Sequence, residues 1–139
     1  MEEKTTCETI YELPVEKLLL LKEDEFFDRT EGGQDNIGIT IASFGTKNGG
    51  VLVVGQKDLK KGGELVGIAD DFGREFAQAI SNVKPAPLTK AKINEHQGKK
   101  IAVIEIKDVG ELKPCAYKKT FYERKSDSNI SLQPDEVRR

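Results

Sequence analysis

The stretch from Ile37 to Gly55 constrains the fold most, because it joins a helix pattern to a buried-strand pattern through a tight turn. Within it, apolar residues recur at helical spacing at Ile37, Ile41 and Phe44. Asp35 and Asn36 precede these residues and are expected to cap the first turn. Gly49-Gly50 closes the helix, because glycine adopts the left-handed conformation after a helix end at no steric cost. The mostly β-branched run Val51 to Val54 then predicts a strand buried on both faces.

Length and composition indicate one domain spanning residues 1–139, with the extreme end of segment 1–13 expected to be frayed. The chain is 37% hydrophobic and 33% charged. Its longest leucine run, Leu18 to Leu21, is far shorter than the roughly 20 residues of a membrane span. The sequence lacks the basic segment and apolar core of a secretory signal, so a cytoplasmic location without membrane association is expected. Cys7 and Cys115 match no zinc spacing and are expected to be two unrelated thiols.

Two further helices are predicted. One runs from Val15 to Leu21. The other begins after Asp70-Asp71, which is expected to cap it, and ends before Lys84-Pro85, because proline cannot continue the helical hydrogen bonds. Its apolar face is made by Phe72, Phe76, Ala79, Ile80 and Val83. Such a face usually packs into a core.

Strand-like segments alternate with these helices. The first is Glu23 to Arg29, with Phe26 or Phe27 turned inward, and Leu65 to Ile68 is expected to form a hairpin with the central strand. Later strands are predicted at Leu88–Ile93, Ile101–Ile106 and Thr120–Arg124, separated by loops at Val109–Lys119 and Ser126–Ser131, with a helix-like turn at Pro134–Val137. The order predicts an α+β (mixed α/β) domain with a central mixed β-sheet and two main helices packed on it.

The net charge of −2 conceals an uneven distribution. Residues 1–30 carry nine acidic and four basic side chains, or −5, whereas residues 82–125 carry eleven basic and five acidic side chains, or +6. A basic second half gives weak support for nucleic-acid binding. The alternative is that these lysines are solvated on strand edges and turns, where they also block edge pairing.

The order of short motifs resembles the Schlafen AlbA-like domain family. The segment Ala42-Ser43-Phe44-Gly45-Thr46-Lys47, the Gly-Gly turn, the apolar strand and Gly55-Gln56-Lys57-Asp58 are similar to its central signature. Further similarities are Leu65-Val66-Gly67-Ile68, Lys113-Pro114 and the segment from Tyr122 to Asn129. The resemblance spans about Leu18 to Val137. It implies a nucleic-acid-binding domain with a possible regulatory role, and the family also contains nucleases.

An acidic trio follows from this resemblance. Schlafen-type nucleases use three carboxylates, and the matching positions here are Glu23, Asp28 and Asp58. The resemblance implies that they are catalytic and hold Mg²⁺ or Mn²⁺, hard cations that prefer oxygen ligands. Asp28 stands where the family usually has glutamate, and Arg29-Thr30 replaces its usual Phe-Lys. A spacing of five on an extended strand also requires a bulge or bend, because side chains alternate between faces. The alternative is a solvated acidic strand edge.

A second candidate site is basic and rich in glycine. Asn48, Gly49 and Gly50 are expected to offer amides at an exposed turn, and further donors are expected from Lys57, Lys60, Lys61, Arg124, Lys125, Ser126 and Asn129. Together they predict a phosphate-binding surface. The alternative is that the glycines serve only the helix-to-strand turn. Lys125 replaces a glycine that is usual in the family.

Three functions therefore remain open from the sequence. The first is a nucleic-acid-binding module for RNA or DNA, the second a metal-dependent endoribonuclease, and the third a non-catalytic protein-interaction domain. A lone copy of the domain could also form a homo-oligomer. No organic cofactor is expected, because no Gly-x-x-x-x-Gly-Lys-Ser/Thr run is present. The single histidine, His96, is expected in a hairpin turn, and Tyr122 could stack on a base or simply pack at a strand edge.

Overall fold

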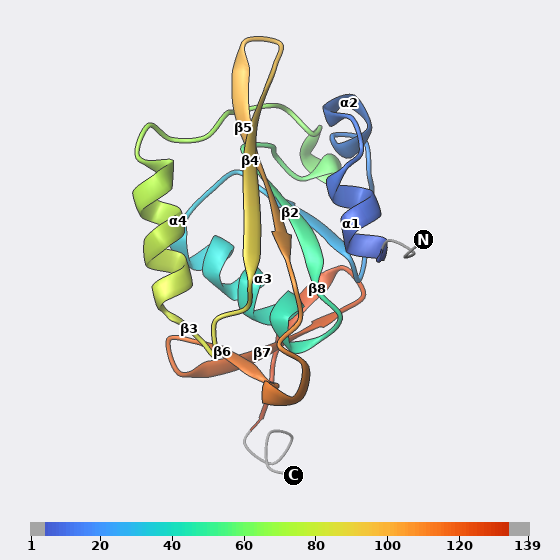
Figure 1. Cartoon of the computed structure of the whole chain (residues 1–139). Coiled ribbons are helices and arrows are strands. Elements are labelled where there is room, and N and C mark those ends of the chain that lie inside the picture. The colour runs from blue at the N-terminus through green and yellow to red at the C-terminus, as the bar shows by residue number, and fades with distance from the viewer. Residues whose placement is uncertain (1–4, 134–139) are drawn as a thin grey trace.

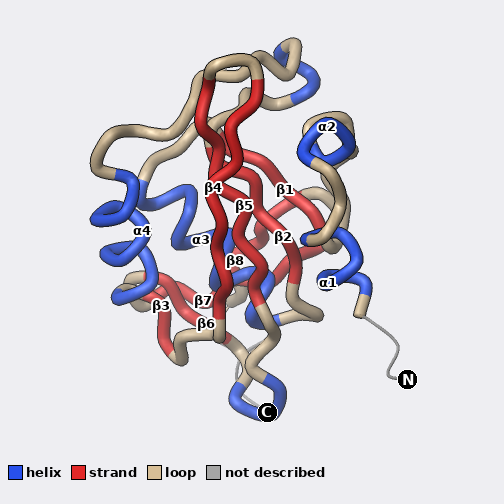
Figure 2. Tube along the Cα trace, turned by 45° about the horizontal axis from the view of Figure 1, so that its top comes forward, coloured by secondary structure: helices blue, strands red, loops and turns tan. Residues whose placement is uncertain are grey.

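Two four-stranded β-sheets form the frame of the structure, a computed structural model that describes residues 5–133 (Figures 1 and 2). The first sheet has the order β1 (Phe27–Thr30), β2 (Gly50–Val54), β5 (Lys99–Ile106) and β4 (Thr89–His96). Its β1–β2 pair is parallel, and its other pairs are antiparallel. The second, antiparallel sheet has the order β3 (Val83–Lys84), β6 (Cys115–Tyr117), β7 (Thr120–Lys125) and β8 (Ser128–Ser131). The predicted α+β class is confirmed.

Helices cover both faces of the first sheet (Figure 1). Helix α1 (Thr6–Tyr11) and helix α2 (Val15–Leu18) lie on one face. Helix α3 (Gln34–Thr46) lies on the other, between the two sheets, and helix α4 (Phe72–Ser81) packs beside it. Two short 3-10 turns complete the fold, η1 (Leu59–Lys61) and η2 (Gly110–Leu112).

Strand β2 is buried along its whole length, as the apolar run predicts. Because side chains alternate along a strand, its residues enter two separate cores. Leu52 and Val54 pack with α3 and α4, whereas Val51 and Val53 pack with α1 and α2. Strand β5 divides its side chains in the same way, and so the pair β2–β5 separates the two cores.

The turn between α3 and β2 depends on glycine, as expected. Gly49 has φ +78°, and its amide donates to the carbonyl of Phe44 at 2.8 Å, which ends the helix. Gly50 has no space for a side chain, because a β-carbon there would lie 2.4 Å from the Phe44 ring. Both glycines are buried.

The expected helix caps are wrong in detail. Helix α3 starts after Gly33, and no side chain caps it. Asp35 instead accepts a hydrogen bond from the Tyr117 hydroxyl at 2.6 Å, and Asn36 donates to the Gly32 carbonyl. Asp71 is the N-cap residue of α4, but its side chain makes no capping hydrogen bond.

Other boundaries differ where the pattern was short or polar. Helix α2 ends at Leu18 instead of continuing to Leu21, and 65–68 forms only an isolated bridge between Gln56 and Leu65. Within two expected loops the structure has strands β6 and β8. Helix α1 lies in a segment for which no helix was predicted, and Thr5 caps it through Glu8 in a capping box. The turn predicted at Pro134–Val137 lies outside the described residues.

Two further expectations concern the cysteines and the membrane. Cys7 and Cys115 are both free and buried, as two unrelated thiols should be. Burial raises the pKa of each thiol to about 11. Within residues 5–133 there is no helix of the length and apolar character that a bilayer crossing demands.

Replacing Gly38 by alanine tests the packing of α3 against the second sheet. Alanine normally favours a helix over glycine by about 1 kcal/mol. At Gly38, however, a β-carbon would lie 2.0 Å from the Tyr117 ring. We expect Gly38→Ala to lower the free energy of unfolding by about 1–3 kcal/mol, as overpacking does, measured by urea denaturation.

Gly73→Ala in α4 is the matched control. A β-carbon at Gly73 meets nothing within 4 Å. We expect this variant to be as stable as the wild type or more stable by up to about 1 kcal/mol. Equal stabilisation by both substitutions would contradict the close contact of α3 with Tyr117.

Candidate nucleic-acid interface

Arg29 lies among the three carboxylates that were predicted to hold a metal ion. It occupies the same face of β1 as Phe27, and its side chain is fully buried. Its Nε donates to Oε1 of Gln56 at 2.7 Å, and Nη2 donates to the carbonyls of Leu18 and Leu21. Nη1 lies 3.3 Å from the carboxylate of Glu23. Burial lowers the pKa of Arg29, and the charges of Glu23, Asp28 and Asp58 oppose that shift.

Asp28 faces a second buried arginine. Nη1 of Arg124 lies 2.9 Å from the Asp28 carboxylate, and the same nitrogen donates to the Asn129 side chain at 2.8 Å. Burial raises the pKa of Asp28, although Arg124 and the amide of Arg29 act in the opposite direction. A polar pocket of about 240 Å³ lies beside this group, with Thr40 also in its wall. Asp28 is therefore already engaged by the fold.

Asp58 has a local structural role. Its carboxylate accepts a hydrogen bond from the amide of Lys60 at 2.9 Å and so caps the η1 turn. The negative charge of Asp58 acts to raise the pKa of Arg29. The three predicted carboxylates are thus near one cation, but that cation is a guanidinium of the chain itself.

The residues present do not fit Mg²⁺ or Mn²⁺. A divalent ion needs several oxygen ligands that converge on one point. No group of three or more His, Cys, Asp or Glu side chains within residues 5–133 is arranged to hold a metal ion. Glu23 and Asp28 each face an arginine instead. The catalytic role implied for Glu23, Asp28 and Asp58 therefore gains no support from the geometry.

The turn at Asn48, Gly49 and Gly50 does not present glycine amides to a ligand, which corrects the prediction that it binds phosphate. Gly49 and Gly50 are buried, and the Gly49 amide is used inside the fold. Asn48 is exposed, and its carbonyl accepts from the thiol of Cys7. The reading in which these glycines serve the helix-to-strand turn accounts for them fully.

The structure also corrects the prediction that Arg124 contacts a phosphate. Its residue exposure is 1%, and its guanidinium donates to the carbonyls of Asp24 and Phe27 as well as to Asp28 and Asn129. It joins the second sheet to β1 and is not available to a phosphate. Lys125 and Ser126 are exposed at the β7–β8 turn.

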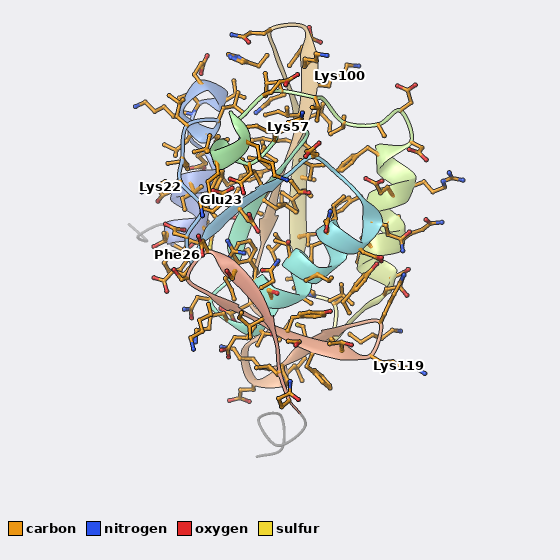
Figure 3. All side chains as sticks on the ribbon, turned by 180° about the vertical axis from the view of Figure 1, so that it is seen from behind. Lys22, Glu23, Phe26, Lys57, Lys100 and Lys119 are labelled. Atoms are coloured by element: carbon orange, nitrogen blue, oxygen red, sulfur yellow. The ribbon has the colours of Figure 1, made fainter. Side chains whose placement is uncertain are left out.

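Five lysines lie at one end of the molecule, which we call the lysine end: Lys57, Lys60, Lys61, Lys99 and Lys100. The first three surround η1, and the other two begin β5 at the tip of the β4–β5 hairpin. The two segments are joined, because the amide of Ile68 donates to the Lys100 carbonyl at 2.9 Å. Seen from behind, Lys57 and Lys100 lie toward the same end, and Lys119 lies at the other (Figure 3).

Four of these lysines are exposed, and Lys57 is half-buried. Lys57 pairs with Glu64 at 3.8 Å, but their side chains are 36% and 69% exposed, so the pair is weak. The sequence indicated the first three lysines. It did not indicate Lys99 and Lys100, because only the pairing of the hairpin with the loop after η1 brings them near.

Comparison with known proteins adds the family and the fold. A family model described as Schlafen, AlbA_2 matches residues 22–133. No curated protein matches the sequence. Among solved structures, the DIP2311 protein from Corynebacterium diphtheriae superposes with a TM-score of 0.66 at 18% identity, over 85% of this chain and 25% of that one.

A second similar structure is the N-terminal domain of a protein from Nitrosomonas europaea described as related to the ATP-dependent DNA helicase RecG. Its TM-score is 0.54 at 17% identity, over 84% of this chain and 82% of that one. This chain spans about a quarter of DIP2311 but most of the Nitrosomonas domain. At these identities the two structures support the fold alone.

Removing the Arg29 side chain tests whether it is the internal cation of this region. We expect Arg29→Met to lower the free energy of unfolding by about 3–5 kcal/mol, because it leaves buried oxygens without a donor. Arg29→Lys should recover only part of this loss, since an ammonium cannot reproduce the fork of contacts. Urea denaturation of the wild type and the two variants measures the free energies of unfolding and so ranks them.

Arg74→Met is the control for loss of one arginine. Arg74 pairs with Asp71 at 3.0 Å on the surface, where its side chain is 73% exposed. We expect a change of less than about 1 kcal/mol. If Arg29→Met were equally mild, the guanidinium would not be an internal cation on which this region depends.

Proposed function

The chain belongs to the Schlafen, AlbA_2 family, and from this premise we propose that it is a nucleic-acid-binding domain that contacts the phosphate backbone through its lysine end. The observation that carries the proposal is the convergence of lysines from η1 and from the β4–β5 hairpin. In this proposal the lysine end takes the place of the turn at Asn48, Gly49 and Gly50, which the sequence predicted to bind phosphate.

The chemistry of these side chains favours backbone contacts over base recognition. A lysine ammonium is a flexible point charge with three donors, whereas base edges are read mostly by bidentate groups such as arginine. The described arginines are not placed for this role at the lysine end: Arg29 and Arg124 are buried, and Arg74 lies on α4. Phosphate contacts alone predict binding with little sequence preference and strong dependence on salt.

The similarity to solved structures is compatible with this proposal. One of them is described as related to a DNA helicase, so a nucleic-acid partner is a reasonable expectation for a domain of the same fold. The choice between DNA and RNA is decided by experiment. The acidic trio adds no second function, because two of its carboxylates face arginines and the third caps a turn.

Neutralising three exposed lysines of the lysine end tests the proposal. We expect the triple variant Lys60→Gln, Lys61→Gln and Lys100→Gln to bind labelled DNA and RNA about tenfold more weakly than the wild type at low salt. Each lost phosphate contact on duplex DNA should also reduce the slope of log K against log salt by about 0.9. Fluorescence anisotropy over a range of salt concentrations measures both quantities.

A triple variant of equal charge is the control. Lys84, Lys119 and Lys125 are exposed, and they lie on strands and turns of the second sheet. Changing them to glutamine should alter affinity much less. If this control lost more affinity than the first variant, the interface would lie on the second sheet. If the wild type did not bind at low salt, the nucleic-acid proposal would fail and a protein partner would become the leading alternative.

A further inference from the structure

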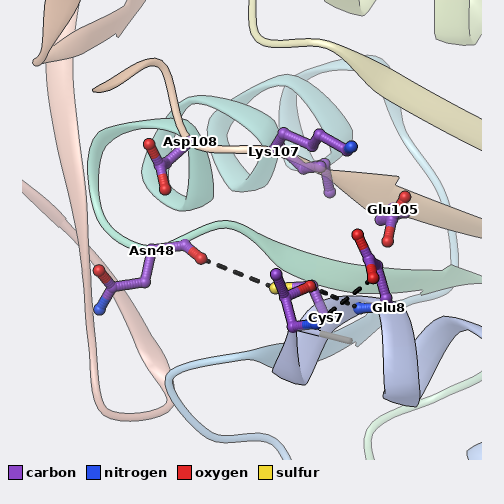
Figure 4. Close-up of a pocket in the computed structure, with 8 residues that line it drawn as sticks. Cys7, Glu8, Asn48, Glu105, Lys107 and Asp108 are labelled. Carbon is purple, nitrogen blue, oxygen red and sulfur yellow. Dashed lines mark hydrogen bonds between the residues drawn. The ribbon is translucent and has the colours of Figure 1, made fainter. Parts of the chain in front are cut away.

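A pocket of about 230 Å³ lies where β5 ends, at the end of that strand opposite to the lysine end. Its wall comes from α1, from the α3–β2 turn and from the segment after β5 (Figure 4). Three of the lining residues are acidic: Glu8, Glu105 and Asp108. This pocket has no part in the proposed nucleic-acid interface.

Glu105 is the unusual group in the pocket. It is 2% exposed and lies on the face of β5 that otherwise contributes Ile101 and Val103 to the core beneath α1 and α2. Its side chain makes no hydrogen bond and no ion pair with any residue in the described range 5–133. Buried carboxylates are almost always paired, because removing the charge from water is costly. The carboxylate therefore has unused capacity to accept donors.

The groups around Glu105 do not neutralise it. In Figure 4 the carboxylates of Glu105 and Glu8 point toward one another. Among the described residues, the Glu8 carboxylate accepts only the long 3.3 Å hydrogen bond of the Thr5 amide, and Asp108 accepts from the amide of Gly110. Lys107 lines the pocket but forms no ion pair with Glu105.

The opposite side of Glu105 does not supply a partner either. Lys90 stands beside Glu105 across the β4–β5 pair. Its ammonium lies 5.4 Å from the centre of the Tyr11 ring, and it forms no ion pair among the described residues. Lys90 and Glu105 both line a second pocket of about 220 Å³.

The remaining wall is apolar or neutral. The thiol of Cys7 has its pKa raised to about 11, chiefly by burial and further by Glu105 and Asp108, so it stays protonated near neutral pH. It donates to the carbonyl of Asn48. Its uncharged side chain gives the pocket a less polar part next to the carboxylates. This combination suits a cation carried on a short hydrocarbon chain.

We propose that this pocket binds a primary alkylammonium group, held between the carboxylates of Glu105 and Glu8. An ammonium has three donors and no acceptor, and so it matches two carboxylates that form no ion pair among the described residues. A metal ion is a poorer match, because no set of three or more suitable ligands exists in residues 5–133. The hydrocarbon chain would lie against Cys7. The ammonium could belong to a free diamine or to a lysine side chain.

Titration of the full chain with 1,4-diaminobutane, followed by amide NMR shifts, tests the proposal. We expect saturable shifts confined to the amides of α1 and of 105–108. Nα-acetyl-lysine amide, which keeps its side-chain ammonium, is titrated in parallel to separate the two sources of the group. Tighter binding of the diamine supports a free amine, and tighter binding of the lysine derivative supports a side chain. 1-Butanol, a neutral chain of the same length, should cause no such shifts.

Two isosteric substitutions identify the carboxylates. Glu105→Gln should weaken binding of 1,4-diaminobutane by about tenfold or more, and Glu8→Gln should weaken it while keeping the capping box, in which glutamine is acceptable. Glu111→Gln removes one charge from an exposed residue on η2 and should leave the affinity unchanged. Equal affinity of the Glu105 and Glu111 variants, or no saturable shift in the wild type, would overturn the proposal.

A stability measurement separates binding from a structural role. Without ligand, Glu105→Gln should have the same melting temperature as the wild type or a higher one, because a carboxylate without a partner is removed from a buried site. With 1,4-diaminobutane, the wild type should gain melting temperature and the variant should not. A lower melting temperature of the variant without ligand would show that Glu105 serves the fold, and would overturn the proposal.

Discussion

The double burial of β2 and β5 is the constraint on which the rest of the structure depends. Each strand sends alternate side chains into two different cores, so neither face of the sheet can be left to solvent. Helices α1 and α2 must cover one face, and α3 must cover the other. Any charged group that enters either core needs partners within the fold. Arg29 and Arg124 satisfy this condition with several oxygens each, whereas Glu105 does not.

The two buried arginines change the meaning of charge in this sequence. Arg29 draws Glu23 and the backbone near Leu18 and Leu21 toward β1, and Arg124 ties β7 to β1 through Asp28. Both arginines and both carboxylates therefore serve the fold. The count of basic residues in 82–125 overstated the positive charge available to a polyanion, because it includes Arg124, which is buried. The charge that matters for binding is the exposed charge of the lysine end.

Sequence patterns predicted the parts of the fold in which hydrophobic periodicity is strong. The run Val51 to Val54 is buried as expected, and Phe27 is the inward one of the two phenylalanines that the sequence offered. The apolar face predicted for the helix is confirmed in part: Phe72 and Ala79 are buried on α4, whereas Val83 lies on β3. Strands β6 and β8 were missed, because they are short, and β8 carries mostly polar residues that pair only through long-range contacts. For the site, local sequence indicated Lys57, Lys60 and Lys61 but not the hairpin lysines. The burial of Arg29 had one signal: it is two residues after Phe27, on the same face of a strand.

The bonds of Arg124 bear on how the chain is made. Its guanidinium donates to carbonyls of Asp24 and Phe27, which lie 100 and 97 residues earlier in the chain. During synthesis the first strand therefore emerges from the ribosome long before the arginine that completes its hydrogen bonds. A domain with such long-range contacts cannot fold segment by segment from its N-terminus. The carbonyls of Asp24 and Phe27 therefore lack these donors until Arg124 has been synthesised.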